Sequence, residues 1–307
     1  IPMSQSPTIG LALGSGASRG WSHIGVIDAL VEEGIEPDIV CGTSVGAMVG
    51  ASYLAGNLDA LEEWVLKSSR SDVYRFFDVK LSQSGFVDVE RMDKFIHEYV
   101  AGKDLEIDDL DKPFLAVATC LTTGQEAWSR EGSVAQWVRA SMSLPGLFSP
   151  VRIDDKWLVD GGLVNPVPVT ACRALGADIV IAVNLNADIV GKALKDKHVS
   201  SAEEEEGLLH SLKQQAKDYS SSLFSSGSGD KAPPGLLSVV SSSINIFQDR
   251  ITRSRLAGDP ADIIMAPRLR DVGLLEFGKA AEAIKTGKAC VQKVLPDIQD
   301  LIESLQA

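Results

Sequence analysis

The sequence predicts an α/β fold in three layers (α/β/α), with helices on both faces of a central, mostly parallel β-sheet. Three observations support this prediction. Short apolar runs without polar alternation are typical of strands that are buried on both faces. Helical segments separate these runs, as in the βαβ units of a parallel sheet. Glycine-rich turns follow the first two runs, 9–13 and 38–41, where strand ends of such a sheet form a crevice.

The N-terminal part of the chain alternates predicted strands with predicted helices. A strand over 9–13 leads through a glycine-rich loop to a helix over 21–33, which Gly34 ends. A second strand over 38–41 precedes residues 47–54, which have the composition and length of a buried helix. Amphipathic spacing predicts the next two helices, over 58–67 and 90–100.

The later elements follow the same pattern. An apolar run over 114–121 predicts another buried strand, and the turn after it predicts a hairpin with residues 125–129. Ser133 suits the N-cap of a helix that must end before Pro145. The remaining predicted elements are strands at 151–153, 157–159, 178–183 and 262–266, a helix at 166–175, and a helix from 277 that Pro296 interrupts.

The composition changes at about 188–234, where consecutive glutamates and repeated serines offer little apolar surface to bury. We expect a flexible insertion there, with a functional lid as the less common alternative. After the insertion, apolar residues at helical spacing form a stripe. This stripe predicts a helix packed on the core, with membrane contact as the alternative. The prediction is therefore one domain over 1–307, with an insertion at 188–234 and a C-terminal helical segment at 277–307. The stripe consists of Leu236, Val240, Ile244, Phe247 and Ile251.

Composition disfavours several classes of partner and compartment. The formal net charge of −13 argues against nucleic acid and against electrostatic docking on an anionic bilayer, so a lipid would have to bind through apolar contact. The four cysteines form no C-x-x-C pair, which favours a reducing compartment and gives no zinc site. The chain shows neither a membrane-length apolar run nor a secretory signal. We therefore expect a cytoplasmic protein without a metal or another cofactor.

The pentapeptide Gly42-Thr43-Ser44-Val45-Gly46 lies between a predicted strand and a predicted helix. Strand, G-x-S-x-G and helix are the context of a nucleophile elbow, in which a sharp turn presents the serine at the positive end of the helix. The flanking glycines, Gly42 and Gly46, allow the turn to close. The alternative is a plain glycine-rich turn in which Ser44 only caps the helix. The combined context favours a nucleophile.

A second glycine-rich loop, Gly14-Ser15-Gly16-Ala17-Ser18-Arg19-Gly20, follows the first predicted strand. Its third glycine comes one place too late for the dinucleotide fingerprint G-x-G-x-x-G. Loops at the carboxyl ends of adjacent parallel strands converge, so backbone N–H groups of this loop can face an oxyanion formed at Ser44. We favour an oxyanion hole over a nucleotide site or a turn without a ligand.

A serine hydroxyl needs a base within hydrogen-bond reach to become a nucleophile. The order of an α/β-hydrolase triad requires a late histidine, and none of the four histidines follows the last predicted strand. His23 is at the start of the first predicted helix, and His97 is on the surface of a predicted helix. The insertion contains His198 and His210. The usual triad therefore lacks a suitable histidine.

A carboxylate can replace the histidine, because burial raises the basicity of a carboxyl group. Asp160 is the candidate, since Gly161 and Gly162 allow its backbone to pass close to another loop. The alternative is that Asp-Gly-Gly is a surface turn.

Four ordered motifs resemble the patatin-like phospholipases, most of all the bacterial branch related to neuropathy target esterase (RssA-type proteins). The resemblance covers nearly the whole chain except the insertion. The motifs are the loop Gly14–Gly20, the elbow Gly42–Gly46, Ala140-Ser141 with Pro145, and Asp160-Gly161-Gly162, and the likeness continues through 165–168 and 174–180 to 256–260.

This resemblance implies a patatin-like serine hydrolase that cleaves acyl esters of phospholipids, lysophospholipids and related lipids. It implies a catalytic dyad, with Ser44 as nucleophile and Asp160 as base, that works through an acyl-enzyme. Ser15 and Ala17 stand where many members have glycine, which leaves the pair of oxyanion donors open. Arg19 matches a basic position of the family, which positions either phosphate or the loop. The expected oxyanion and substrate-binding residues are Gly14, Gly16, Ala17, Arg19, Gly20 and Val45.

Two other functions stay open at this point. One is an acyltransferase of the same fold, and the other is a non-catalytic regulatory protein that binds lipid or protein. The expected partner is a lipid acyl ester, with transient contact at the inner face of a membrane as an option and without nucleic acid. The sequence does not indicate an oligomeric state.

Overall fold

The computed structural model describes residues 6–68, 89–188, 236–273 and 276–306. The chain divides into two compact units, Ile1–Asp188 with Phe247–Ala307, and Ile189–Ile246. The predicted insertion lies outside the described residues except for Asp188, so its flexibility and the single-domain organisation stay predictions.

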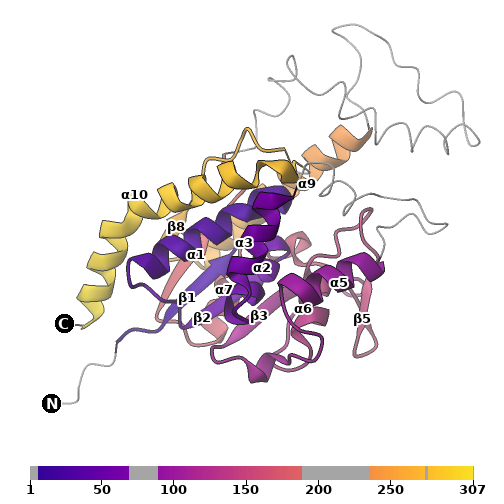
Figure 1. The fold of residues 1–307 in the computed structure, drawn as a ribbon, viewed down its shortest axis with the longest axis horizontal. Coiled ribbons are helices and arrows are strands. Elements are labelled where there is room, and N and C mark those ends of the chain that lie inside the picture. The colour runs from indigo at the N-terminus through magenta and orange to yellow at the C-terminus, as the bar shows by residue number, and fades with distance from the viewer. Residues whose placement is uncertain (1–5, 69–88, 189–235, 274–275, 307) are drawn as a thin grey trace, which may run out of the picture. The chain divides into compact units, whose positions relative to one another are not determined.

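The core of the first unit is a mixed eight-stranded sheet in the order β5-β6-β3-β2-β1-β7-β8, with β4 paired to β3. Figure 1 shows the neighbouring strands β1, β2 and β3 of this sheet. The pairs among β3, β2, β1, β7 and β8 are parallel, whereas β6 and β4 run antiparallel to β3. Each predicted strand is confirmed within a residue or two. The strands are β1 (Ile9–Leu13), β2 (Ile39–Thr43), β3 (Phe114–Cys120), β4 (Glu126–Ala127), β5 (Val151–Ile153), β6 (Lys156–Asp160), β7 (Ile179–Val183) and β8 (Ile263–Met265).

The central strands are buried on both faces, as their unbroken apolar runs predicted. In β1, Leu11 and Leu13 belong to a core on one face, whereas Ala12 belongs to a second core on the other face. Helices α1 (Ser22–Glu32), α2 (Val45–Leu54) and α10 (Ala280–Gln306) cover the first face. Helix α7 (Val169–Ala174) covers the second. The predicted three-layer α/β/α architecture is therefore confirmed.

The other predicted helices also form. A 3₁₀ turn, Ala17–Trp21, leads into α1, and Gly34 lies beyond its end with a φ of 75°. Ser133 caps α6 and accepts a hydrogen bond from the Gln136 nitrogen at 3.4 Å. The remaining helices are α3 (Leu58–Lys67), α5 (Val89–Tyr99), α6 (Val134–Ser141) and α9 (Leu236–Gly258).

Three predictions about the helices are wrong in detail. Helix α7 begins at Val169 rather than at Pro166, because Pro168 disfavours helical backbone at the residue before it. Helix α10 continues through Pro296, where we expected an interruption. In α9, Phe247 is 61% exposed, so the apolar stripe does not pack on the core at this position. Leu236 and Val240 of the stripe lie where side chains are not described, and the buried residues of the described part of α9 are polar: Gln248, Asp249 and Thr252.

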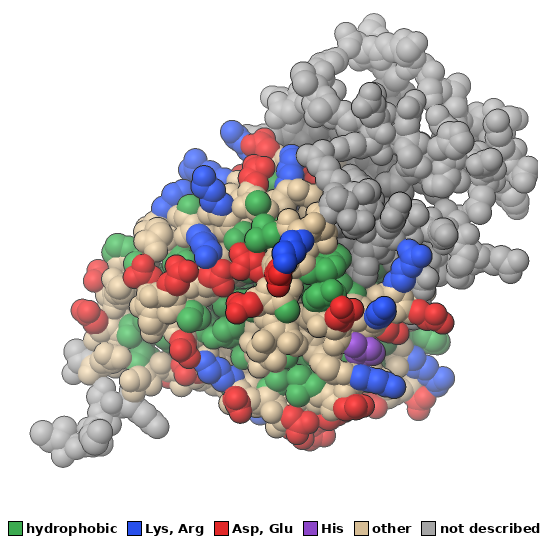
Figure 2. All heavy atoms as spheres, in the orientation of Figure 1, with side chains coloured by type: hydrophobic (Ala, Val, Ile, Leu, Met, Phe, Trp, Pro, Cys, Tyr) green, Lys and Arg blue, Asp and Glu red, His purple; other side chains and the backbone are tan. Residues whose placement is uncertain are grey.

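The surface of the described residues carries acidic and basic side chains interspersed, as Figure 2 shows for one face. Many of these side chains form partly exposed ion pairs, for example Lys112 with Glu36 at 3.2 Å and Lys288 with Asp28 at 3.2 Å. Exposed pairs contribute little to stability individually. Among the described helices, none has both the length and the apolar character needed to span a bilayer.

Helices α1 and α10 approach each other closely through two glycines. A Cβ at Gly25 would lie 2.0 Å from the Ile284 carbonyl oxygen, and one at Gly287 would lie 2.1 Å from the Ser22 carbonyl oxygen. Both neighbours are backbone atoms, which cannot move without moving the helix. The layer that covers the first face of the sheet therefore depends on residues without a side chain.

We predict that Gly287→Ala lowers the free energy of unfolding by about 1–3 kcal/mol, because the added methyl group overpacks this helix contact. Urea unfolding measures the change. Gly258→Ala is the matched control, since a Cβ at this helical glycine meets no atom within 4 Å. Equal stability changes in the two variants would contradict the close-approach account.

Candidate active site

Ser44 occupies the sharp turn between β2 and α2 that the sequence predicted. Its backbone has φ 57° and ψ −123°, a conformation that is strained for any residue other than glycine. The turn is held from outside, because the Ser44 nitrogen donates to the Ser141 hydroxyl at 2.8 Å and this hydroxyl donates to the Val117 carbonyl at 2.5 Å. Ser141 lies in a motif of the predicted family, but the sequence did not indicate this role. The Ser44 N–H group is therefore not available to a ligand.

The glycines of the elbow are required by close approach. A Cβ at Gly42 would lie 2.3 Å from the Ala47 nitrogen, and one at Gly46 would lie 2.2 Å from the Leu13 carbonyl oxygen. Helix α2 can therefore start directly against the end of β1. This contact places the first turn of α2 beside the glycine-rich loop that follows β1.

Asp160 ends β6 and contacts Ser44 directly. The Ser44 hydroxyl donates to Oδ2 of Asp160 at 2.7 Å, and the Gly162 nitrogen donates to Oδ1 at 2.7 Å. The side chain is almost completely buried, with 2% exposure. Burial raises the pKa of Asp160 to about 6, while the hydrogen bonds from Ser44 and Gly162 act in the opposite direction. The structure thus brings together the two residues that the sequence predicted as nucleophile and base.

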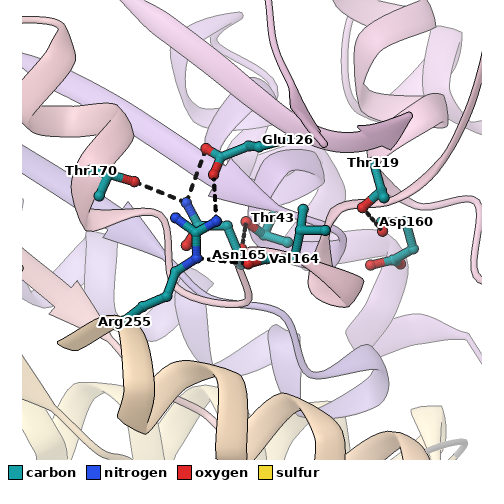
Figure 3. A network of polar contacts seen from close by, with 8 residues as sticks. All are labelled: Thr43, Thr119, Glu126, Asp160, Val164, Asn165, Thr170 and Arg255. Carbon is teal, nitrogen blue, oxygen red and sulfur yellow. Dashed lines mark hydrogen bonds and ion pairs between the residues drawn. The ribbon is translucent and has the colours of Figure 1, made fainter. Parts of the chain in front are cut away.

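The backbone of Asp160 is also fixed. Its nitrogen donates to the Ser143 carbonyl at 2.9 Å, and its carbonyl accepts the Thr119 hydroxyl at 2.8 Å (Figure 3). The next residue, Gly161, passes so close to β3 that a Cβ would lie 2.1 Å from the Val117 carbonyl oxygen. The Asp-Gly-Gly segment is therefore buried against the sheet, and the surface-turn alternative is wrong.

The glycine-rich loop after β1 lies beside the elbow, but part of it is already bonded. The Gly14 nitrogen donates to the Val183 carbonyl at 3.1 Å, and the Ser15 nitrogen donates to the Pro166 carbonyl at 2.8 Å. Gly14 is therefore unsuitable as an oxyanion donor, although we expected it among the oxyanion residues. Ala17 has a φ of 48°, which favours glycine and accounts for glycine being common at this position in the resembled family.

Two buried side chains brace this loop from behind. Arg19 is 1% exposed, and its Nε donates to the Gly16 carbonyl at 3.2 Å. Burial lowers the pKa of Arg19 to about 10, and the charge of Asp188 opposes this shift. The His23 Nε2 donates to the Gly14 carbonyl at 2.7 Å, and burial lowers the pKa of His23 to about 4. His23 is thus a neutral structural residue, and Arg19 is placed to hold the loop rather than to meet a phosphate.

The remaining expected loop residue, Gly20, contacts the elbow. A Cβ at Gly20 would lie 2.2 Å from the Val45 side chain, so the loop and the start of α2 pack without a gap. His97 lies on α5, outside the surroundings of Ser44, and His198 and His210 lie outside the described residues.

An apolar cavity adjoins Ser44, and the sequence did not predict its lining. Aromatic side chains from α3 and α5 form part of its wall, with ring centroids of Trp64 and Phe95 4.7 Å apart. The lining comes from segments far apart in the chain, which explains why no local pattern revealed it. It consists of Ala17, Trp21, Ser44, Val45, Met48, Trp64, Phe95, Met142, Leu144, Leu147, Phe148 and Phe277.

No metal-ligand cluster of three His, Cys, Asp or Glu side chains occurs in the described parts of the chain. The four cysteines are free and buried. Burial raises the pKa of the Cys41 thiol well above its usual value, so this residue, which directly precedes Gly42 of the elbow, is not a reactive thiolate.

Comparison with known proteins identifies relatives. A family model described as patatin-like phospholipase matches residues 11–173. An uncharacterized NTE family protein of Mycobacterium tuberculosis is 30% identical over 342 aligned residues, which cover 95% of this chain and 92% of that protein. Human patatin-like phospholipase domain-containing protein 6 is 35% identical over 187 residues, 59% of this chain and 13% of that protein. Lysophospholipase NTE1 of Pyricularia oryzae is 28% identical over 299 residues, 95% of this chain and 19% of that protein.

We predict that Asp160→Asn stabilises the protein at pH 8. A carboxyl group whose pKa is about 6 when folded and about 4 when unfolded opposes folding wherever it is charged. This opposition is on the order of 2–3 kcal/mol above pH 6 and disappears as the pH falls below about 4. Asparagine keeps the shape and removes the charge. Urea unfolding of both proteins between pH 4 and pH 8 should show a difference that grows with pH.

The control for this experiment is Asp155→Asn, because the Asp155 side chain is 91% exposed. Asp155→Asn should change the free energy of unfolding little between pH 4 and pH 8. An Asp160→Asn variant that is less stable than the wild type at pH 8 would contradict the buried-charge account.

Proposed function

Because the chain belongs to the patatin-like phospholipase family, we propose that it hydrolyses acyl esters of lipids with Ser44 as nucleophile and Asp160 as base. Its relatives include a lysophospholipase, which makes phospholipids and lysophospholipids the first substrates to test. The observation that carries the proposal is the 2.7 Å hydrogen bond from the Ser44 hydroxyl to a buried carboxylate. A structural serine cap would instead bond to its own helix, and Ser44 makes no such side-chain bond.

In the proposed acylation step, Oδ2 of Asp160 takes the hydroxyl proton of Ser44 as Oγ forms a bond to the ester carbonyl carbon. The carbonyl π electrons move to its oxygen, which becomes an oxyanion. When the tetrahedral intermediate collapses, the C–O bond to the alcohol breaks, and the departing oxygen takes the proton from Asp160. The acyl group remains on Ser44.

In the proposed deacylation step, water occupies the position of the departed alcohol. Asp160 accepts a proton from this water as its oxygen attacks the acyl carbon, and it returns the proton to Ser44 Oγ as the acid leaves. The pKa of about 6 suits Asp160 to this exchange, because it is unprotonated at neutral pH and yet more basic than an exposed carboxylate.

We assign the oxyanion hole to the backbone N–H groups of Gly16, Ala17 and Val45. The N–H groups of Gly14, Ser15 and Ser44 are bonded elsewhere, which supports this narrower set. Val45 is the first residue of α2, where the helix dipole favours negative charge. Each such donor typically lowers the barrier by about 3–4 kcal/mol.

The apolar cavity is the proposed acyl site. Ser44 forms part of its wall, so a chain that enters the cavity presents its ester carbonyl to the Ser44 hydroxyl. Apolar recognition agrees with the net charge of −13, which gives little electrostatic attraction to anionic lipid surfaces. Access to such a substrate requires at least transient contact with a lipid surface, which we propose on this ground.

The proposal predicts that Ser44→Ala and Asp160→Asn each abolish hydrolysis in a panel of lysophospholipids, phospholipids and short acyl esters. Removing either the nucleophile or its base typically lowers kcat by about 10⁴-fold or more. Circular dichroism and thermal unfolding show whether each variant remains folded. Substantial hydrolysis by either folded variant would refute the dyad. A product acylated on an added alcohol would favour the acyltransferase function, and an inactive wild type would favour the regulatory one.

A second prediction concerns pH. The unprotonated Asp160 is the reactive form, so kcat/KM should fall below an apparent pKa of about 6 and level off above it. Initial rates with a neutral short-chain ester between pH 4.5 and pH 8.5 measure this limb without titrating the substrate. If kcat/KM falls only below about pH 4.5, the base is an ordinary exposed carboxylate instead.

A further inference from the structure

The chain that leaves Asp160 crosses β3 to reach the end of β2. Asp160 pairs with Ala118 on one side of β3, and Thr43 pairs with Val117 on its other side. The crossing ends in a buried hydrogen bond, in which the Thr43 hydroxyl donates to the Asn165 carbonyl at 2.8 Å. Thr43 directly precedes Ser44, so this bond ties the segment of the base to the strand of the nucleophile.

Whereas Thr43 bonds to the backbone of Asn165, other residues hold its side chain. Its Nδ2 donates to Oε1 of Glu126 at 3.1 Å and to the Thr170 hydroxyl at 3.0 Å. A carboxylate only accepts hydrogen bonds, so Glu126 requires the amide nitrogen, not the amide oxygen, at this place. The side-chain oxygen of Asn165, Oδ1, is left buried without a hydrogen-bond partner among the described residues. An unsatisfied buried acceptor is unfavourable, which indicates that the nitrogen contacts decide the orientation.

Arg255 on α9 completes this arrangement (Figure 3). Its Nη2 contacts Oε2 of Glu126 at 3.0 Å, and its Nε donates to the Val164 carbonyl at 2.7 Å. The two side chains are partly buried, with 35% exposure for Arg255 and 18% for Glu126. One guanidinium therefore holds both the carboxylate that orients Asn165 and the backbone next to Asn165.

We propose that Arg255, Glu126 and Asn165 act as positioning residues that set the approach of Ser44 Oγ to Asp160 Oδ2. We call them the Arg255 network. They touch neither the reacting atoms nor the apolar cavity. They hold Thr43 through the backbone carbonyl of Asn165, and they hold Asp160 through the segment 161–165 that follows it. The network also makes the placement of α9 a condition for the geometry of the site. The inference rests on the proposed function, because it concerns the same serine and carboxylate.

Small changes in the position of Ser44 Oγ relative to Asp160 Oδ2 should have large effects on the rate. Misplacing reacting groups by about 1 Å typically lowers the rate about 100-fold. The other end of the Asp160 segment is held separately by Thr119 and Ser143, so loss of the Arg255 network should loosen the crossing without unfolding β6. We therefore expect a fall in kcat rather than a loss of the fold.

The test uses Arg255→Lys and Glu126→Gln in the full chain. Lysine keeps the charge but cannot reach Glu126 and Val164 together with one planar group, and glutamine replaces one of the two acceptors by a donor. Each variant should lower kcat about 10- to 100-fold with little change in KM. The double variant should lose no more than the worse single variant, because both break the same network.

The matched controls are Arg173→Lys and Asp262→Asn. Arg173 contacts Asp262 at 2.6 Å with 31% exposure of each side chain, and it also donates to the backbone carbonyls of Ala177 and Asp178. This ion pair has similar chemistry and burial on another part of the fold. The control variants should retain kcat. An unchanged kcat in the Arg255 and Glu126 variants, or an equal loss in the controls, would overturn the proposal.

A readout without turnover separates this proposal from the proposed function. If the hydrogen bond from Ser44 weakens, the pKa of Asp160 should rise, because that bond lowers it in the wild type. Comparing Arg255→Lys with and without Asp160→Asn by urea unfolding across pH reports this pKa even in an inactive protein. If the pH dependence that Asp160 causes lies at higher pH in Arg255→Lys than in the wild type, the network is supported. An unchanged pH dependence overturns it. Absence of hydrolysis by the wild type would refute only the proposed function.

Discussion

The hydrogen bond between Ser44 and Asp160 depends on two chain segments that meet across β3. The nucleophile comes from the carboxyl end of a parallel strand, whereas the base comes from the end of an antiparallel strand on the far side of β3. Gly161 makes the crossing possible, because any side chain there would collide with the Val117 carbonyl. The mixed sheet is therefore a requirement of the site, and the two residues are 116 positions apart in sequence.

The same burial that suits Asp160 to accept a proton opposes folding of the protein around its charge. This carboxylate has 2% exposure, and in the described part of the chain hydrogen bonds from Ser44 and Gly162 offset its loss of water. Strain in the Ser44 backbone adds to this cost. The close contacts of Gly42, Gly46 and Gly161 and the hydrogen bond to Ser141 hold this strained geometry in place.

The local features of the fold and the site could be predicted from the sequence. Unbroken apolar runs indicated the doubly covered strands, the G-x-S-x-G motif pointed to Ser44, and the resemblance of four ordered motifs to a known family pointed to Asp160. The cavity lining, the role of Ser141 and the contact of Arg255 with Val164 could not be predicted. Ser141 and Ser44 are 97 positions apart, and Arg255 and Val164 are 91 apart, so only the folded sheet brings them together. Helix α9 shows the converse, because its apolar stripe did not identify its polar buried face.

The most direct test of the central claim is to trap the acyl-enzyme. A short acyl ester is mixed with the protein and quenched in acid within one turnover, and peptide mass spectrometry locates the acyl group. The account predicts an acyl group on Ser44 that is absent from Ser44→Ala and that forms far more slowly in Asp160→Asn. An acyl group on another side chain, or ester hydrolysis without any acylated peptide under conditions that retain a known acyl-enzyme, would contradict it.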